Sequence, residues 1–138
     1  MVKKKSSAIY NINYHLVFCP KYRKTISKNQ MEFLKETIET ICLTKNWDIL
    51  ELQIMPDHLH LFISAPPIDS PTSMVKILKG TSALRLFRKF PELRKVLRKG
   101  SFWSPSYYVG TAGKMSAETI KKYIQNQTKS PPRNSPTV

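Results

Sequence analysis

Two histidines that flank a single leucine are the first candidates for chemistry in this chain. They are His58 and His60, on either side of Leu59. On a β-strand, residues i and i+2 point to the same face, so both imidazoles would stand together and could share one divalent cation. Two ligands alone do not make a metal site, so the alternative is a solvated strand face that carries two histidines.

A tyrosine and a glutamine four residues apart form a second candidate. Tyr123 and Gln127 would share one face of a helix. A tyrosine hydroxyl can take a phosphoryl group covalently, but its ordinary pKa of about 10 makes it a weak nucleophile at neutral pH. A divalent metal that polarises a phosphate lowers this demand, and an amide oxygen suits Mg²⁺ or Mn²⁺. Gln127 is therefore a candidate third ligand beside His58 and His60, although an ordinary packing stripe would explain the same spacing.

The chain is strongly basic. Its 138 residues include 23 Lys and Arg against 9 Asp and Glu, a formal net charge of +14. This excess predicts an anionic partner, and basic residues beside aromatic ones suit single-stranded or hairpin nucleic acid. The alternative is a basic surface that only keeps the protein soluble. The candidate DNA-binding residues are Lys21, Arg23, Lys76, Lys79, Arg85 and Arg88.

Composition excludes several other classes of protein. Hydrophobic residues make up 41% of the chain, enough for a core at this length, which excludes a disordered protein. No apolar run approaches the roughly 20 residues of a membrane-spanning helix, and no apolar segment near the start resembles a secretory signal. Cys19 and Cys42 are too few for a disulfide framework, so we expect two reduced thiols in a cytoplasmic protein.

Periodicity predicts the elements that must position these residues. Alternating patterns indicate strands over residues 9–18, 47–55, 58–65 and 102–111, with a tight turn at Pro56-Asp57. Helical patterns indicate helices from Ser27 or Asn29 to about Lys45, from Ser70 or Thr72 to about Lys89, and from Ser116 to about Thr128. This order predicts an α+β fold, a ferredoxin-like βαββαβ antiparallel sheet with an extra C-terminal helix that carries Tyr123. Residues 1–129 would form one domain and residues 130–138 a disordered tail.

The same patterns predict which side chains face inward. On the first strand, His15 lies opposite the apolar face, where we expect a surface or DNA-contacting role rather than a third histidine ligand. Of Tyr107 and Tyr108 on the last strand, one must point inward. Gly110 and Gly113 would bracket a flexible link before the last helix. The residues expected on the inner face of the second helix are Met74, Ile77, Leu78, Leu84 and Phe87.

Four stretches of this sequence together resemble one known family. They are residues 14–23 (Tyr-His-Leu-Val-Phe-Cys-Pro-Lys-Tyr-Arg), 55–61 (Met-Pro-Asp-His-Leu-His-Leu), 103–113 and 120–127. The chain resembles the single-tyrosine HUH transposases of small bacterial and archaeal insertion sequences, the TnpA type, over roughly Ile9 to Lys129. HUH stands for histidine, a hydrophobic residue and histidine, and Leu59 fits the middle position.

The resemblance implies an activity and a set of roles. Such enzymes cut and rejoin single-stranded DNA at the ends of their element through a 5′-phosphotyrosine. Carried over by position, Tyr123 is the nucleophile, and His58, His60 and Gln127 hold Mg²⁺ or Mn²⁺. The resemblance also implies a homodimer whose sheets join edge to edge, with active sites completed in trans, and binding of hairpins at the element ends. Asp57, next to the histidine pair, is interpreted as a turn residue rather than a ligand.

Two other functions are compatible with the same sequence. One is a non-catalytic RNA- or single-stranded-DNA-binding domain with the same element order, although its usual short aromatic motif is absent here. The other is a domesticated relative of the transposases that acts on dispersed hairpin repeats. A bound metal and a covalent protein–DNA adduct would distinguish an enzyme from a binding domain.

Overall fold

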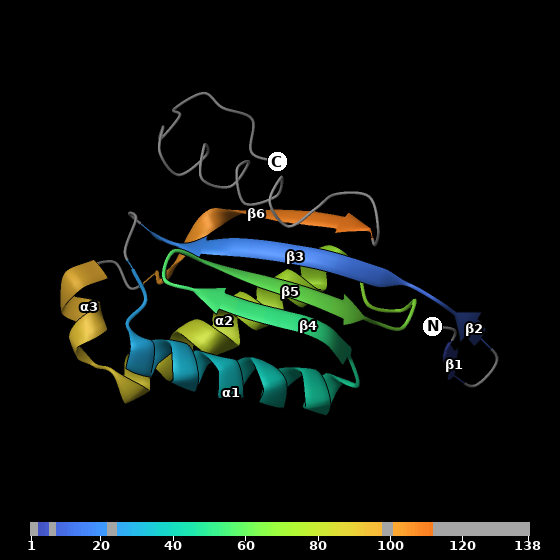
Figure 1. Ribbon diagram of the computed structural model, residues 1–138, viewed down its shortest axis with the longest axis horizontal. Coiled ribbons are helices and arrows are strands. Elements are labelled where there is room, and N and C mark those ends of the chain that lie inside the picture. Colours follow the sequence, from blue (N-terminus) through green and yellow to red (C-terminus); the bar gives the residue numbers. More distant parts are fainter. Residues whose placement is uncertain (1–2, 6–7, 22–24, 98–100, 112–138) are drawn as a thin grey trace, which may run out of the picture.

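The protein is built on a four-stranded antiparallel sheet that carries two long helices on one face (Figure 1). This computed structural model describes residues 3–5, 8–21, 25–97 and 101–111. The sheet order is β4-β5-β3-β6. Its strands are β3 (Asn13–Pro20), β4 (Asp48–Met55), β5 (His58–Ser64) and β6 (Trp103–Thr111). The predicted ferredoxin-like arrangement is confirmed, whereas the predicted last helix from Ser116 and the tail at 130–138 lie outside the described residues.

The two central strands supply most of the core. In β3 and β5, Leu16 pairs with Leu61 and Phe18 with Leu59, and all four side chains are fully buried. Because successive residues of a strand point to opposite faces, these apolar side chains all face the helices. The residues between them therefore face the other side of the sheet.

The first long helix, α1 (Lys28–Lys45), begins and ends as its sequence predicts. The hydroxyl of Ser27 accepts a hydrogen bond from the Gln30 amide at 3.2 Å, and the Gln30 side chain accepts one from the Ser27 amide at 3.1 Å. This reciprocal pair satisfies two amides that a helix start leaves unpaired. The helix ends at Asn46, whose φ of 62° lies in the left-handed region that asparagine tolerates.

The second long helix, α2 (Pro71–Lys89), is capped by Ser70 and has Pro71 in its first turn. Its predicted inner face was wrong at Leu84, which is 45% exposed, while Leu86 is fully buried. The inner face instead passes through Ser82, whose hydroxyl accepts a hydrogen bond from the indole of Trp103 at 2.8 Å. A buried serine carries no apolar signal, so the pattern placed Leu84 on this face, whereas Met74, Leu78 and Phe87 are buried as predicted.

The N-terminal strand is divided. The predicted strand over residues 9–18 is instead β2 (Ala8–Tyr10) and β3, and the carbonyl of Ile12 between them accepts a hydrogen bond from the Ala65 amide at 3.1 Å. β2 pairs with β1 (Lys3–Lys5) in a two-stranded hairpin at the end of the main sheet (Figure 1). A short helix, α3 (Glu92–Leu97), follows α2. Among the described helices, none is long and apolar enough to cross a membrane.

Candidate metal centre and nucleic-acid interface

The histidine pair lies on β5, on the sheet face opposite the helices. Leu59 and Leu61 point into the helix-covered core, so His58 and His60, which alternate with them, point the other way. The two histidines are nevertheless only 7% and 5% exposed. They do not stand on a solvated strand face, which was the alternative explanation for their spacing.

His58 is held by its neighbour in the turn. Its Nδ1 lies 2.8 Å from Oδ1 of Asp57, a carboxylate that is about half exposed. The two residues follow Met55 and Pro56 at the junction of β4 and β5, the tight turn that the sequence predicts. Asp57 therefore does more than shape the turn, because it occupies one ring nitrogen of a candidate metal ligand.

His60 is held by a residue from another strand. Its Nε2 lies 3.0 Å from Nδ1 of His15 on β3. The His15 ring in turn stacks on Phe62, with ring centroids 4.2 Å apart and planes 5° from parallel. His15 is therefore partly buried, and it contacts His60 directly. Phe62 was not among the predicted site residues, although its alternation with His60 along β5 would have placed it on this face.

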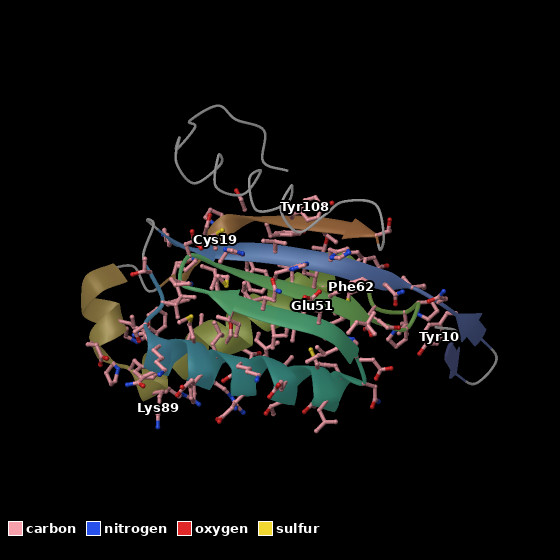
Figure 2. The ribbon with its side chains drawn as sticks, viewed as in Figure 1. Tyr10, Cys19, Glu51, Phe62, Lys89 and Tyr108 are labelled. Atoms are coloured by element: carbon pink, nitrogen blue, oxygen red, sulfur yellow. The ribbon has the colours of Figure 1, made fainter. Side chains whose placement is uncertain are left out.

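Burial and charge both act on this cluster of imidazoles. Burial lowers the pKa of His15, and the nearby carboxylate of Glu51 on β4 partly opposes that effect. Burial lowers the pKa of His60 as well, helped by the charges of His15 and His58 and opposed by Glu51. Both rings are therefore kept neutral near pH 7, the state in which an imidazole nitrogen can bind a metal. Glu51 and Phe62, paired across β4 and β5, are labelled in Figure 2.

The described residues include two of the three predicted metal ligands, His58 and His60. Two buried imidazoles on one strand face, those of His58 and His60, fit the donor chemistry of Mg²⁺ or Mn²⁺ sites that also carry oxygen ligands. Within the described ranges, no group of three His, Cys, Asp or Glu side chains is placed to hold one ion. The predicted site would therefore need a third ligand of another residue type or from another part of the chain. Gln127, the predicted third ligand, and Tyr123, the predicted nucleophile, lie outside the described residues.

A small apolar cluster lies beside the histidines on the same face. It contains Val17 and Cys19 of β3, with Tyr108 of β6 packed against them (Figure 2). Burial, together with the charge of Asp57, raises the pKa of the Cys19 thiol to about 12, and burial raises the pKa of Cys42 to about 12. Both cysteines are free, as predicted, and their protonated thiols are poor nucleophiles.

Gly110 has a packing role that the sequence did not reveal. It lies within β6, as the strand predicted over 102–111 has it, and is paired with His15. The flexible link that we expected between Gly110 and Gly113 extends beyond the described residues. A Cβ at Gly110 would collide with the phenol of Tyr108. The glycine therefore lets Tyr108 lie along the strand, close to the histidine cluster. Gly113 is outside the described residues.

The basic residues of α2 do not lie with the histidines. Lys76, Arg85 and Arg88 are exposed on the helix that covers the opposite face of the sheet. Lys21 follows β3 and is partly exposed, with its amide bonded to the carbonyl of Phe102 at 2.8 Å. Arg23 lies outside the described residues. A DNA surface on α2 would therefore be separated from the histidine pair by the thickness of the sheet.

Lys79 differs from the other predicted DNA contacts because its ammonium group is directed at β6. It donates hydrogen bonds to the carbonyls of Ser104 and Ser106, at 2.6 and 3.1 Å. The β3–β6 register shifts between Phe18 and Pro20, so the two carbonyls belong to an irregular part of the strand. Burial lowers the pKa of Lys79 to about 8, partly opposed by Cys19. This lysine therefore joins α2 to β6.

Comparison with known proteins identifies the family. A family model described as "Transposase IS200 like" matches residues 8–127. The ISDra2 transposase TnpA of Deinococcus radiodurans is 35% identical over 127 residues, which cover 91% of each chain. The transposase for insertion sequence element IS200 of Salmonella typhimurium is 37% identical over 119 residues, covering 86% of this chain and 78% of the relative.

Solved structures agree with this assignment. A crystal structure from Deinococcus radiodurans, assigned to a transposase, superposes with a TM-score of 0.82 at 35% identity, and covers 91% of this chain and 97% of its own. A REP-associated tyrosine transposase bound to a REP hairpin superposes with a TM-score of 0.54 at 13% identity, a likeness of fold alone. Because the family model spans most of the chain and the relatives exceed 30% identity over most of their length, this protein belongs to the IS200-like transposases.

Proposed function

We propose that this transposase cleaves and rejoins single-stranded DNA at the ends of an insertion sequence, by transesterification through a 5′-phosphotyrosine. The observation that carries the proposal is the pair His58 and His60, buried on one strand face and each held by a neighbour. The family match supports it, because that match extends to residue 127 and so includes Tyr123 and Gln127.

The proposed reaction needs no external energy source. The hydroxyl of Tyr123 gives up its proton as its oxygen attacks the phosphorus of one phosphodiester, a new P–O bond forms, and the bond from phosphorus to the 3′ oxygen breaks. The 3′ oxygen leaves as a hydroxyl after gaining a proton, while the 5′ phosphate stays on the tyrosine. Attack by another 3′ hydroxyl reverses these steps and rejoins a strand. One phosphodiester is exchanged for another at each stage, so ATP is not required.

His58, His60 and Gln127 are the proposed ligands of Mg²⁺ or Mn²⁺. When bound, this ion would polarise the scissile phosphate and so lower the demand on a tyrosine whose ordinary pKa is about 10. The protein's own contribution is to lower the pKa of His60 by burial and to fix the orientation of His58 through Asp57 and of His60 through His15.

DNA binding is proposed to involve surfaces on both faces of the sheet. The net charge of +14 favours a polyanion, and the exposed Lys76, Arg85 and Arg88 on α2 are suited to phosphate contacts away from the histidines. We propose hairpins at the element ends as the duplex ligand of that surface. The homodimer with active sites completed in trans is also a proposal; among the described strands, β4 and β6 are the outer strands of the sheet at which such joining would take place.

A covalent-adduct assay tests the proposal. Wild-type protein, Tyr123→Phe and the control Tyr10→Phe would be incubated with labelled single strands from the DNA that flanks the gene. Each would be run with Mg²⁺, with Mn²⁺ and with a chelator, and denaturing gels would be read for label that migrates with the protein. We expect an adduct with wild type and Tyr10→Phe in the presence of metal, and none with Tyr123→Phe.

Two results would contradict the proposal. An adduct that persists in Tyr123→Phe would move the nucleophile to another residue. Tight DNA binding without any adduct, on strands shown to contain the element ends, would favour a non-catalytic nucleic-acid-binding domain of the same fold.

A further inference from the structure

The contact between Asp57 and His58 differs in kind from the contact between His15 and His60. A carboxylate at neutral pH only accepts hydrogen bonds, whereas an imidazole can donate or accept. Asp57 Oδ1 lies 2.8 Å from His58 Nδ1, so the proton in this contact must be on Nδ1. In the 3.0 Å contact between His15 and His60, either ring can be the donor.

The position of this proton decides which nitrogen of His58 is available. With Nδ1 protonated, the lone pair of the neutral ring is on Nε2, the nitrogen farther from the backbone. Carboxylate–histidine–metal arrangements use this device to fix both the tautomer and the orientation of a ligand. A freely rotating imidazole would spend part of its time in the other tautomer, or turned away from the cation.

The turn that carries Asp57 is itself anchored. Met55 pairs with His58 at the end of the β4–β5 ladder. The carbonyl of Pro56 accepts a hydrogen bond from the amide of Ile26 at 2.6 Å, and Ile26 is buried in the core. The carboxylate is therefore presented from a backbone that is held on two sides, although its side chain is 51% exposed.

We propose that Asp57 is a positioning residue that holds His58 in the Nδ1-protonated tautomer, with Nε2 directed to the divalent cation. This inference rests on the proposed function insofar as His58 is a metal ligand. It goes beyond the turn role that the sequence suggested for Asp57. It also makes the two histidines unequal within the described part of the chain, because His58 contacts a carboxylate there whereas His60 contacts another imidazole.

Asp57→Asn separates the positioning role from the turn role. Asparagine is as suitable as aspartate in a tight turn, so the hairpin should be retained. Its side-chain amide can donate as well as accept, so it no longer dictates the tautomer of His58. Glu39→Gln, an exposed residue of α1, is the matched control because it removes the same charge far from the histidines.

The first measurement is made without metal. The chain has 3 histidines, and all of them belong to this cluster, so the nitrogen NMR spectrum of protein labelled at histidine contains three rings to assign. In wild type we expect a protonated Nδ1 and an unprotonated Nε2 for His58. In Asp57→Asn we expect the His58 signals to move toward a mixture of tautomers, with the backbone spectrum of the sheet unchanged.

The second measurement is Mn²⁺ affinity, read from free Mn²⁺ by electron paramagnetic resonance in the absence of DNA. We expect Asp57→Asn to weaken binding by about 10-fold or more, the range found when a ligand's supporting partner is removed. Glu39→Gln should bind as wild type does. An Nε2-protonated His58 in wild type, or equal Mn²⁺ affinity in Asp57→Asn and wild type, would overturn the inference.

The outcome is distinguishable from failure of the proposed function. Suppose that wild type forms no adduct, but that Asp57→Asn has a mixture of His58 tautomers and a weaker Mn²⁺ affinity. The proposed transposition chemistry is then wrong, and the positioning role stands. If wild type forms the adduct and Asp57→Asn keeps full Mn²⁺ affinity, the function stands and the positioning role is wrong.

Discussion

The two faces of the central sheet are made from the same strands but serve different ends. On the helix-covered face, Leu16, Leu59 and Leu61 are fully buried in a continuous apolar core. On the other face, His15 and His60 lie within hydrogen-bond distance of each other, and His58 lies within hydrogen-bond distance of Asp57. Burial of leucine removes apolar surface from water and stabilises the fold, whereas burial lowers the pKa of His15 and His60 and so opposes their protonation.

Alternation along a strand can therefore separate stability from chemistry. Along residues 58–61, the two histidines point to one face and the two leucines that alternate with them point to the other. A substitution on one face should change the free energy of unfolding, and a substitution on the other should change activity. We expect the effects to decrease from these two faces to the junction at Lys79 and then to the basic helix.

Replacing His60 should give the largest effect on activity. His60→Ala removes a proposed ligand, and a bound ion contributes several kcal/mol of transition-state stabilisation, so we expect cleavage to fall by at least about 100-fold. DNA affinity should be largely kept because the exposed basic residues are untouched. Adduct formation and DNA binding would be measured beside Thr40→Ala on α1. Unchanged turnover would remove His60 from the ligand set.

Replacing its neighbour Leu61 should instead give the largest effect on stability. Leu61→Ala removes a fully buried side chain of the core and should lower the free energy of unfolding by about 3 kcal/mol. Leu43→Ala is the control, because Leu43 is 79% exposed. Denaturant unfolding would compare both with wild type. If Leu61→Ala and His60→Ala lower stability equally, the two faces do not divide stability from chemistry.

Lys79 tests the junction between the helix layer and the sheet. Lys79→Met removes the donor of two hydrogen bonds to β6 and should cost about 1 kcal/mol at pH 7. The pKa of Lys79 is about 8 when folded and near its ordinary 10.5 when unfolded, so between these values the unfolded chain binds more protons. Wild-type stability should therefore gain a rising contribution with pH across this window, and the variant should lack it.

The check on Lys79 is the difference between the two proteins, because other groups also titrate at alkaline pH. Urea unfolding of wild type and Lys79→Met would be measured at about pH 7, at about pH 10 and midway between them, a range that spans both pKa values. The gap between their free energies of unfolding should widen with pH. Parallel pH profiles would mean that burial does not depress the pKa of this lysine.

The smallest expected effect concerns the basic face of α2. Neutralising Lys76 and Arg85 as Lys76→Gln and Arg85→Gln should weaken DNA binding. The slope of log affinity against log salt should fall by about 0.7 to 0.9 for each phosphate that the protein no longer neutralises. Cleavage of a strand already bound should be unaffected, because α2 lies across the sheet from the histidines. A salt slope equal to that of wild type would exclude this helix as a DNA surface.

The sequence predicted much of the fold because local signals agreed with the tertiary structure. Ser27 and Ser70 cap their helices as expected, and Pro56-Asp57 forms the expected turn. The errors have specific causes. Leu84 was assigned to the core because a buried serine at position 82 interrupts the apolar pattern. The first strand was predicted too long because the strand is interrupted at residues 11–12.

The candidate site was predicted in part. Strand geometry predicts that His58 and His60 share one face of the sheet, and the structure confirms this. The approach of His15 to His60 depends on the pairing of β3 with β5, which brings together residues 45 positions apart. The predicted roles of Tyr123 and Gln127 concern residues outside the described ranges and stay predictions.

By itself, the amino-acid sequence determined the order of the sheet strands and the two long helices, the ends of those helices, the basic charge and the common face of the two histidines. Apart from the total charge, each of these depends on neighbours within a few residues. Only the tertiary structure decided that His15 contacts His60 and that the Lys79 ammonium group donates hydrogen bonds to β6. It also decided that the basic helix lies across the sheet from the histidines. These features depend on strand register and on which face the helices cover. Both are set by packing between distant segments, which a local pattern does not encode.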